Sequence, residues 1–314
     1  MGSTVGDGSF ATVESAFESR GTRCAARIYL PSGDASVPVI VMAHGFGSVR
    51  ELRLPAYAAR FAEAGYAVVL FDYRTFGDSD GTPRQVLDIP SQLQDWRAAI
   101  AWARRLDRVD PTAVVAWGTS FAGGHVLTMG ADGEDLAAII AQVPHTDGPA
   151  AVRATGVRAS LRLLPAALRD SWRAVRGAEP VYVDSIGVPG SVAVMTAPGA
   201  EDAVDRMVAA SGYRRGDHAE TVAARVVLRV GLYSPGRRAG TITCPTLIQV
   251  ADGDDIAPAR SARKAARRIR TSTVIAYPGG HFSPYLPPLF DSVIADQLTF
   301  LRGVVPTGRP DQSA

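Results

Sequence analysis

The chain has 314 residues, of which 46% are hydrophobic, and 33 basic against 31 acidic side chains give a formal net charge of +2. This length and composition allow one large domain or two modest ones with a sizeable core, whereas a nucleic-acid-binding protein would carry a stronger basic excess. No stretch approaches the roughly 20 apolar residues of a membrane-spanning helix, and the polar start MGSTVGDGSFATVES lacks the pattern of a secretory signal peptide, so we expect a cytoplasmic protein without nucleic-acid or membrane partners.

Short apolar runs alternate with helical patterns along most of the chain. In chain order, the early run 25–30 is expected to form an antiparallel edge strand, and buried strands and amphipathic helices then follow one another. The expected strands are 39–43, 67–73, 114–117, 137–143, 246–251 and 273–277, and the expected helices are 55–64, 89–106, 259–268 and 290–301. Such alternation predicts an α/β fold with a mostly parallel sheet flanked by helices.

One long segment interrupts this alternation. Residues 149–240 are mostly helical in pattern, and a plain loop of that length would be unusual in a compact domain. We therefore expect an inserted helical lid at 149–240, lying over the strand ends of a core that is formed by 1–148 and 241–314.

The strand at 114–117 leads into the sequence WGTSFAGGH, in which Ser120 lies between small residues. A strand that ends in G-x-S-x-small and then enters a helix is typical of a nucleophile elbow, where a strained turn projects the serine hydroxyl above the sheet edge. Strand and helix pass close together there, so the residues two before and two after the serine, Gly118 and Ala122, must be small. The alternative is a turn that only packs, or that holds a phosphate at the helix N-terminus, but the glycine motifs of phosphate-binding loops are absent from it.

A serine hydroxyl needs a base to act as a nucleophile, and the base needs an orienting carboxylate. His281 is the best placed of the five histidines, because it lies in a Gly-rich loop directly after the strand at 273–277. For the carboxylate, the segment after 246–251 offers Asp254, which stands four residues before Pro258 at the start of the next helix, with Asp252 as the alternative.

Acyl transfer also needs backbone N–H groups that bind the oxyanion of the tetrahedral intermediate. The amide of Phe121, directly after the serine, is expected to supply one donor. The amide of Phe46, in the loop HGFGS after the first central strand, is expected to supply the other, with His44 as a supporting hydrogen-bonding residue.

The sequence resembles bacterial α/β-hydrolases over nearly its whole length, through the segments HGFGS, FDYRTFGDSDGTPR, DWRAAIAWAR, WGTSFAGGH, D-x-x-x-P and GGHF. The resemblance is to dienelactone-hydrolase-like and X-Pro-dipeptidyl-peptidase-like (S15-type) serine hydrolases, a group that includes fungal polyketide acyltransferases with a helical lid. It implies the α/β-hydrolase fold with Ser120, Asp254 and His281 as the triad. A serine at the elbow argues against epoxide hydrolases and haloalkane dehalogenases, which use a carboxylate, and against dienelactone hydrolases proper, which use a cysteine.

These observations predict an enzyme, a serine hydrolase that cleaves a small-molecule carboxylic ester or thioester through an acyl-enzyme intermediate, without metal or cofactor. Two alternatives stay open: an acyltransferase that passes the acyl group to an alcohol or amine, and a non-catalytic binding protein of the same fold. The acyl group, the leaving group and the oligomeric state, including a homodimer, are not determined. Cys24 and Cys244 lie outside any metal-binding spacing and are expected to be free thiols, with a single disulfide as the alternative.

The lid is expected to set the acyl specificity, because it interrupts the sheet order after 137–143 and must lie over the strand ends. Apolar side chains recur in it at helical spacing. Most of them are expected to pack the lid against the core, and a few to line an apolar acyl pocket: Leu161, Leu163, Leu164, Leu168 and Trp172.

Overall fold

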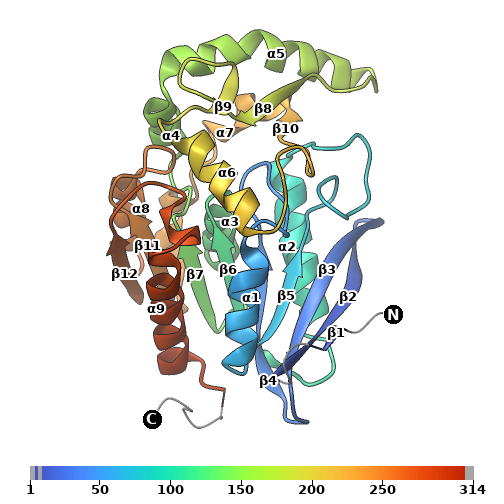
Figure 1. The fold of residues 1–314 in the computed structure, drawn as a ribbon, viewed down its shortest axis with the longest axis vertical. Coiled ribbons are helices and arrows are strands. Elements are labelled where there is room, and N and C mark those ends of the chain that lie inside the picture. Colours follow the sequence, from blue (N-terminus) through green and yellow to red (C-terminus); the bar gives the residue numbers. More distant parts are fainter. Residues whose placement is uncertain (1–3, 6–8, 308–314) are drawn as a thin grey trace.

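The computed structural model describes residues 4–5 and 9–307, and a nine-stranded sheet lies at the centre of this part (Figure 1). The strand order across the sheet is β1-β2-β3-β5-β4-β6-β7-β11-β12. The bounds are β1 Thr4–Val5, β2 Phe10–Ser19, β3 Thr22–Pro31, β4 Val37–Ala43, β5 Ala67–Phe71, β6 Val109–Thr119, β7 Ala138–Gln142, β11 Thr246–Ala251 and β12 Ser272–Tyr277. Neighbours from β5 to β12 pair in parallel and β1 to β3 are antiparallel, so the predicted mostly parallel sheet is confirmed.

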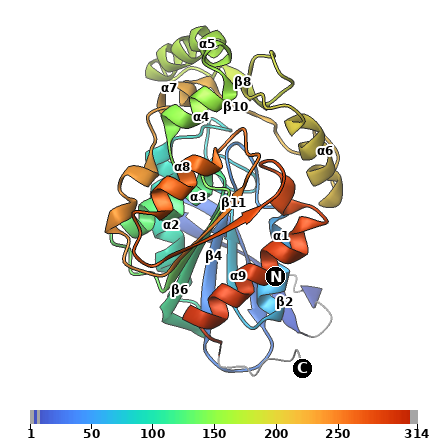
Figure 2. The same ribbon diagram turned by 90° about the vertical axis from the view of Figure 1, so that its left-hand side faces the viewer.

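Helices cover both faces of the sheet (Figures 1 and 2), and its strands β4 and β5 are apolar throughout. One face carries α2 Ile89–Ala103, α3 Phe121–Ala131 and α8 Ala259–Ala266, and the other carries α1 Leu54–Glu63 and α9 Leu289–Val304. In β4, Val39 and Val41 point into the first core, and Ile40 and Met42 point into the second. Because side chains alternate along a strand, an unbroken apolar run suits a strand that is covered on both sides.

The N-terminal edge of the sheet differs from the prediction. β3 is antiparallel to β5, as expected for the run 25–30, but it is not an edge strand because β2 pairs along its whole length. Arg20 and Gly21, with φ angles of 52° and 78°, form the two-residue turn that connects the strands. Such a turn requires positive φ at both central residues, and Arg-Gly is a less familiar sequence for it than Asn-Gly.

The insertion (residues 149–240) leaves the sheet after β7 and returns at β11. It lies over the end of the sheet at which β6 meets α3 (Figures 1 and 2). Its helices are α4 Gly148–Thr155, α5 Val157–Val175, α6 Ala200–Ala210 and α7 Val227–Val230, and its strands β8 Tyr182–Ile186, β9 Ala193–Met195 and β10 Thr221–Ala223 form a small sheet in the order β10-β8-β9. This sheet was not expected, because strands of three to five residues are too short to show a period in the sequence.

Asp170 of α5 is the buried anchor of the insertion. Its Oδ1 accepts a hydrogen bond from the Val181 amide at 2.9 Å, and its Oδ2 accepts from the Arg225 amide at 2.8 Å and from Arg225 Nε at 2.7 Å. The carboxylate is inaccessible to solvent, so these bonds replace its water. They tie α5 to the segment before β8 and to the turn after β10.

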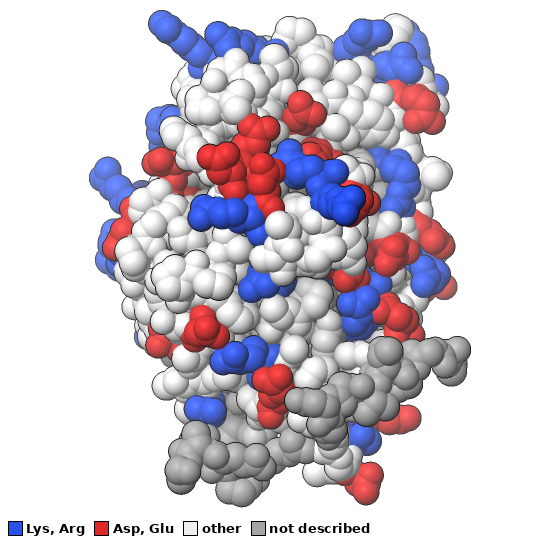
Figure 3. All heavy atoms as spheres, in the orientation of Figure 1, with Lys and Arg blue, Asp and Glu red and all other residues white. Residues whose placement is uncertain are grey.

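Opposite charges are mixed on the face of the molecule seen in Figure 3. Basic side chains gather at its top, where Figure 1 places α5. Within the described ranges 4–5 and 9–307, no helix combines the length and apolar character needed to cross a membrane.

Candidate active site

Ser120 lies at the sharp turn between β6 and α3. Its φ of 55° and ψ of −117° are strained for a residue with a side chain. The strand and the helix approach so closely that a Cβ added at Gly118 would lie 2.2 Å from the Ala122 carbonyl oxygen. Only glycine therefore fits at 118, while the methyl group of Ala122 is accommodated in the core.

The structure brings Ser120, His281 and Asp254 into one hydrogen-bonded chain. Ser120 Oγ lies 2.8 Å from His281 Nε2, and His281 Nδ1 lies 2.7 Å from Asp254 Oδ2. The second carboxylate oxygen of Asp254 accepts hydrogen bonds from the amides of Ile256 at 2.9 Å and Ala257 at 2.7 Å. Four contacts thus hold the imidazole and the carboxylate, both buried, in fixed orientations.

Asp252, the alternative carboxylate, lies on the surface and outside this hydrogen-bonded chain. Its side chain is 61% exposed and pairs at 2.5 Å with Arg263 of α8 on the surface. The loop after β11 turns between the two aspartates, so Asp254 points into the site while Asp252 points toward solvent.

The loop after β4 lies against the serine. A Cβ built at Gly45 would lie 3.0 Å from Ser120 Cβ, closer than side chains usually approach, so glycine at this position lets the loop lie against the serine. The next residue, Phe46, stacks edge-on against Phe121 with ring centroids 5.6 Å apart. Phe121 is the first residue of α3, where a backbone N–H has no partner within the helix. The two amides chosen from the sequence therefore belong to loops that adjoin Ser120.

Three other histidines are buried beside the site. His44 Nδ1 lies 3.0 Å from the Gly45 carbonyl, and both nitrogens of His125 are engaged, with Gln92 Oε1 at 3.0 Å and the Tyr233 hydroxyl at 2.8 Å. The His145 ring stacks on Tyr233. Burial lowers the pKa of His44 to about 4, of His125 to about 3 and of His145 to about 4, so these imidazoles are neutral at pH 7.

A buried polar network behind Ser120 was missed by the sequence reasoning. Gln142 Nε2 donates to Thr119 Oγ1 at 3.3 Å, and Thr119 Oγ1 also contacts the Tyr285 hydroxyl. Gln142 in turn accepts from Gln297 of α9 at 2.9 Å. Glutamines in the apolar runs of β7 and β11 and in α9 were the available signal, because a buried amide requires polar partners.

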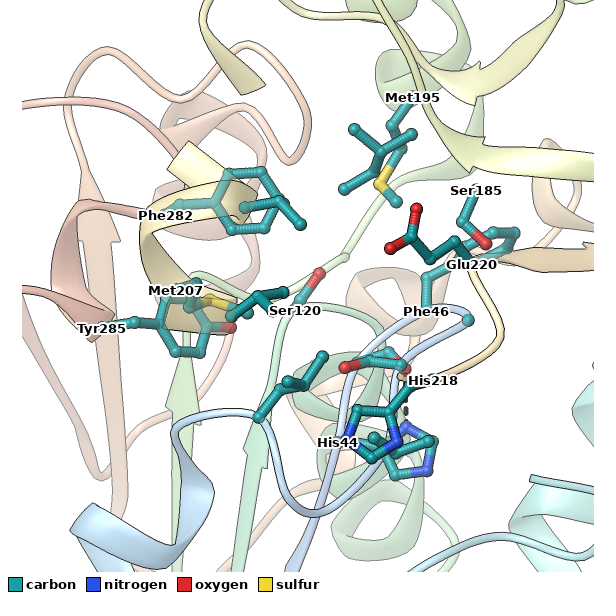
Figure 4. A pocket seen from close by; sticks show the side chains of 18 of the residues that line it. His44, Phe46, Ser120, Ser185, Met195, Met207, His218, Glu220, Phe282 and Tyr285 are labelled. Atoms are coloured by element: carbon teal, nitrogen blue, oxygen red, sulfur yellow. Dashed lines mark hydrogen bonds between the residues drawn. The ribbon is translucent and has the colours of Figure 1, made fainter. Parts of the chain in front are cut away.

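Two cavities meet at Ser120, and both are also lined by Phe46 and Met195. The His281 cavity is lined further by Ser185, Met207, His218, Glu220, His281 and Tyr285. The Leu163 cavity is lined further by Val152, Leu163, Val194, Val227, Val230 and Ile256. Figure 4 shows the His281 cavity, with the Ser120 hydroxyl at its centre, Phe282 and Tyr285 on one side, and Ser185 and Glu220 on the other.

Of the five apolar residues expected to face the core or an acyl pocket, Leu163 alone does so; it is buried and lines a cavity. The other four point outward, with exposures of 58% for Leu161, 36% for Leu164, 56% for Leu168 and 57% for Trp172. Helical spacing identifies an apolar stripe, but α5 lies on the outside of the insertion and buries a different face, which includes Leu163 and Asp170.

Within residues 4–5 and 9–307, no group of three or more His, Cys, Asp or Glu side chains is placed to hold a metal ion. Cys24 and Cys244 are free thiols, as the sequence analysis expected.

Comparisons with known proteins agree with this architecture. A family profile described as X-Pro dipeptidyl-peptidase (S15 family) matches residues 20–276. The quorum-quenching protein AidA of Acinetobacter baumannii (strain MDR-ZJ06) is 42% identical over 306 residues, 98% of this chain and 99% of that protein. The polyketide transferase grgF of a Penicillium species is 30% identical over 156 residues, 49% of this chain and 51% of that protein.

Among solved structures, the alpha/beta hydrolase GrgF from Penicillium sp. sh18 superposes with a TM-score of 0.80 at 21% identity, covering 94% of this chain and 99% of that one. At this identity the likeness shows the fold. Together with the profile match, it confirms the resemblance and the fold class predicted from the sequence motifs. The chain belongs to the X-Pro dipeptidyl-peptidase (S15) family and has the α/β-hydrolase fold.

Proposed function

We propose that this protein is a serine hydrolase that cleaves a carboxylic ester or thioester. The observation that carries the proposal is the hydrogen-bonded chain from Ser120 through His281 to Asp254, with links of 2.8 and 2.7 Å, at the junction of two cavities. Membership of a hydrolase family supports it.

In the proposed mechanism Ser120 Oγ attacks the carbonyl carbon while His281 Nε2 takes the serine proton. Asp254 accepts a hydrogen bond from His281 Nδ1, which fixes the tautomer and stabilises the imidazolium. The amides of Phe46 and Phe121 stabilise the oxyanion. His281 then protonates the leaving oxygen or sulfur as its bond to the acyl carbon breaks. Water adds to the acyl-enzyme, giving its hydroxyl to the acyl carbon and its proton, through His281, back to Ser120.

We also propose that residues 149–240 act as a lid on the core formed by 1–148 and 241–314. Leu163, Val194 and Val227 from this segment form much of the Leu163 cavity, and Met207 closes one side of the His281 cavity. Apolar walls that exclude water would strengthen the electrostatic interactions at Ser120. In this proposal the lid selects the acyl group.

The test is labelling with a fluorophosphonate, an irreversible serine-directed probe, followed by mass spectrometry and assays with aryl esters and acyl thioesters. We expect the adduct on Ser120, and we expect Ser120→Ala to lose activity by about 10⁶, as in other triads. Ser171→Ala is the matched control, because Ser171 of α5 donates to the Ala167 carbonyl and lines neither cavity. An adduct on another residue, or full activity in Ser120→Ala, would reject the proposal; an inert Ser120 would favour the non-catalytic binding protein.

Acyl transfer is the second candidate, and two relatives named as polyketide transferases, which match about half of this chain, support it. A relative named as a thiohydrolase, matched over a similar share, supports hydrolysis instead. The acyl-enzyme would be the same, but an alcohol or amine would take the place of water. Adding graded alcohols to the assay separates the two: a hydrolase keeps releasing the acid, whereas a transferase diverts the product to a new ester.

A further inference from the structure

The position of His281 assigns the two cavities to the two halves of the substrate. This step rests on the proposed function, in which His281 protonates the leaving group. His281 lines the His281 cavity and a further cavity next to it that Ser120 does not line, and it is absent from the lining of the Leu163 cavity. The His281 cavity is thus the one that Ser120 and His281 both line. A leaving oxygen or sulfur within reach of Nε2 continues into it, and the acyl chain occupies the Leu163 cavity.

We propose that the substrate is an ester or thioester with two dissimilar halves. The acyl half is an unbranched alkyl chain held in the Leu163 cavity. The leaving half carries a hydrogen-bonding group, such as an amide or a hydroxyl, close to its ester oxygen or sulfur, and this group binds Ser185 in the His281 cavity.

The Leu163 cavity suits an alkyl chain because aliphatic side chains form most of its wall. They come from α4, α5, β9 and α7 and from the loop after β11, and include Val152, Leu163, Val194, Val230 and Ile256. Besides Ser120, its polar side chains are His145, Thr155 and Ser160. His145 Nε2 lies 3.0 Å from the Tyr233 carbonyl, and Ser160 Oγ donates to the Gly156 carbonyl at 3.3 Å. Burial of alkyl surface is thus the main interaction that this cavity can offer.

The His281 cavity differs because its far wall carries polar atoms without partners. Ser185 of β8 is 6% exposed, and its Oγ has no hydrogen-bond partner among the described residues. His218 Nε2 is likewise buried and unpaired within that part of the chain. Glu220 is different, because Arg215 Nε binds its Oε1 at 2.7 Å. Buried polar groups in folded proteins are generally paired, so an unpaired hydroxyl in the wall of a cavity indicates a ligand group that completes it.

Ser185 packs against the loop after β4, and it lines the same cavity as Ser120. A Cβ added at Gly47 would lie 2.5 Å from Ser185 Oγ, so the hydroxyl faces the loop that contains Phe46. This loop is the one proposed to bind the oxyanion. A hydrogen-bonding group only a few bonds from the scissile ester can therefore reach Ser185, whereas a simple alkyl alcohol leaves it unpaired.

The experiment compares kcat/KM for two series of acyl esters, with ethanol and with glycolamide as the alcohol, each with acyl chains of graded length. In the wild type we expect kcat/KM to rise about fourfold per methylene until the Leu163 cavity is filled. We also expect glycolamide esters to be preferred over ethyl esters at every chain length.

Two variants test the two halves separately. Leu163→Trp should shorten the preferred acyl chain in both series, and Val230→Phe, on another wall, repeats the test in case the first variant does not fold. Ser185→Ala should lower kcat/KM for glycolamide esters by about threefold to tenfold and leave ethyl esters unchanged. Leu164→Trp on the outer face of α5 and Asp184→Asn beside Ser185 are controls outside both linings, and should change neither preference.

The outcomes distinguish this inference from the proposed function. Hydrolysis of no ester by the wild type, without labelling of Ser120, would overturn both. Hydrolysis that depends on Ser120 supports the proposed function, and the variants then decide the assignment. A chain-length change from Ser185→Ala, or a leaving-group change from Leu163→Trp, would reverse the assignment; equal losses in both series would reject it.

Discussion

The backbone of Ser120 is strained, and this conformation projects the serine hydroxyl above the edge of the sheet. The φ of 55° would suit glycine, and the contact between Gly118 and the Ala122 carbonyl shows how tightly the turn is closed. The other two residues of the proposed triad each come from the loop after a different strand. Asp254 follows β11, and His281 follows β12. Asp254 Oδ2 lies 2.7 Å from His281 Nδ1, whereas Asp252, two residues earlier, pairs with Arg263 on the surface.

We predict that Asp254→Asn lowers kcat by about 10⁴, because an amide no longer holds the His281 tautomer that accepts the serine proton. Asp252→Asn is the matched control. It removes a surface ion pair with Arg263 and should change kcat little. Steady-state kinetics with any ester that the wild type hydrolyses measures kcat for both variants. A large loss of kcat in Asp252→Asn with little loss in Asp254→Asn would contradict the role proposed for Asp254.

At the scale of elements, α9 is joined to the sheet by polar contacts inside an apolar core. Gln297 of α9 accepts a hydrogen bond from Trp117 Nε1 of β6 at 3.0 Å and donates to Gln142 of β7 at 2.9 Å and Gln249 of β11 at 2.6 Å. One side chain thus fixes the register of a helix against three strands. Gln142 also contacts Thr119, the residue before Ser120, so the network supports the elbow.

We expect Gln297→Leu to lower the free energy of unfolding by more than about 3 kcal/mol. It would leave three buried polar atoms unpaired, and each costs about 1–3 kcal/mol. Thr299→Leu, on the exposed side of the same helix, should change it by less than about 0.5 kcal/mol. Urea titration followed by tryptophan fluorescence measures both. If Gln297→Leu lowers the free energy of unfolding no more than Thr299→Leu does, the remaining polar groups find other partners and the prediction is wrong.

At the scale of the whole molecule, neutral histidines in the interior link stability to pH. The depressed pKa values of His44, His125 and His145 follow mainly from burial. The unfolded chain therefore takes up protons at a higher pH than the folded one. Burial raises the pKa of Asp72 to about 7 and also raises the pKa of Asp95, which acts in the opposite direction, but these are two groups against three.

We therefore expect the free energy of unfolding to fall as the pH is lowered from about 6.5, the ordinary histidine value, toward 4. Denaturant titrations at fixed pH steps measure this slope. His125→Gln removes one of the groups and should make the slope shallower, by at most about 1.4 kcal/mol per pH unit. A stability that is flat between pH 7 and 4, or a slope that His125→Gln leaves unchanged, would contradict the explanation.

The amino-acid sequence by itself determined the order of elements in the core and the three candidate residues that the structure brings together. Central strands such as 246–251 are apolar because both of their faces are buried, and a serine flanked by Gly118 and Ala122 is a local signal that needs no tertiary information. The preference for Asp254 over Asp252 rested on Pro258, which is also local.

Only the tertiary structure decided which face of α5 is buried, that the insertion holds a small sheet, and that two cavities meet at Ser120. An apolar stripe such as Leu161, Leu164 and Leu168 satisfies helical periodicity equally well whether it faces the core or solvent. The burial of a helix face, and the lining of a cavity by segments as distant in the chain as Leu163 and Ile256, depend on how whole elements pack, which no local pattern encodes.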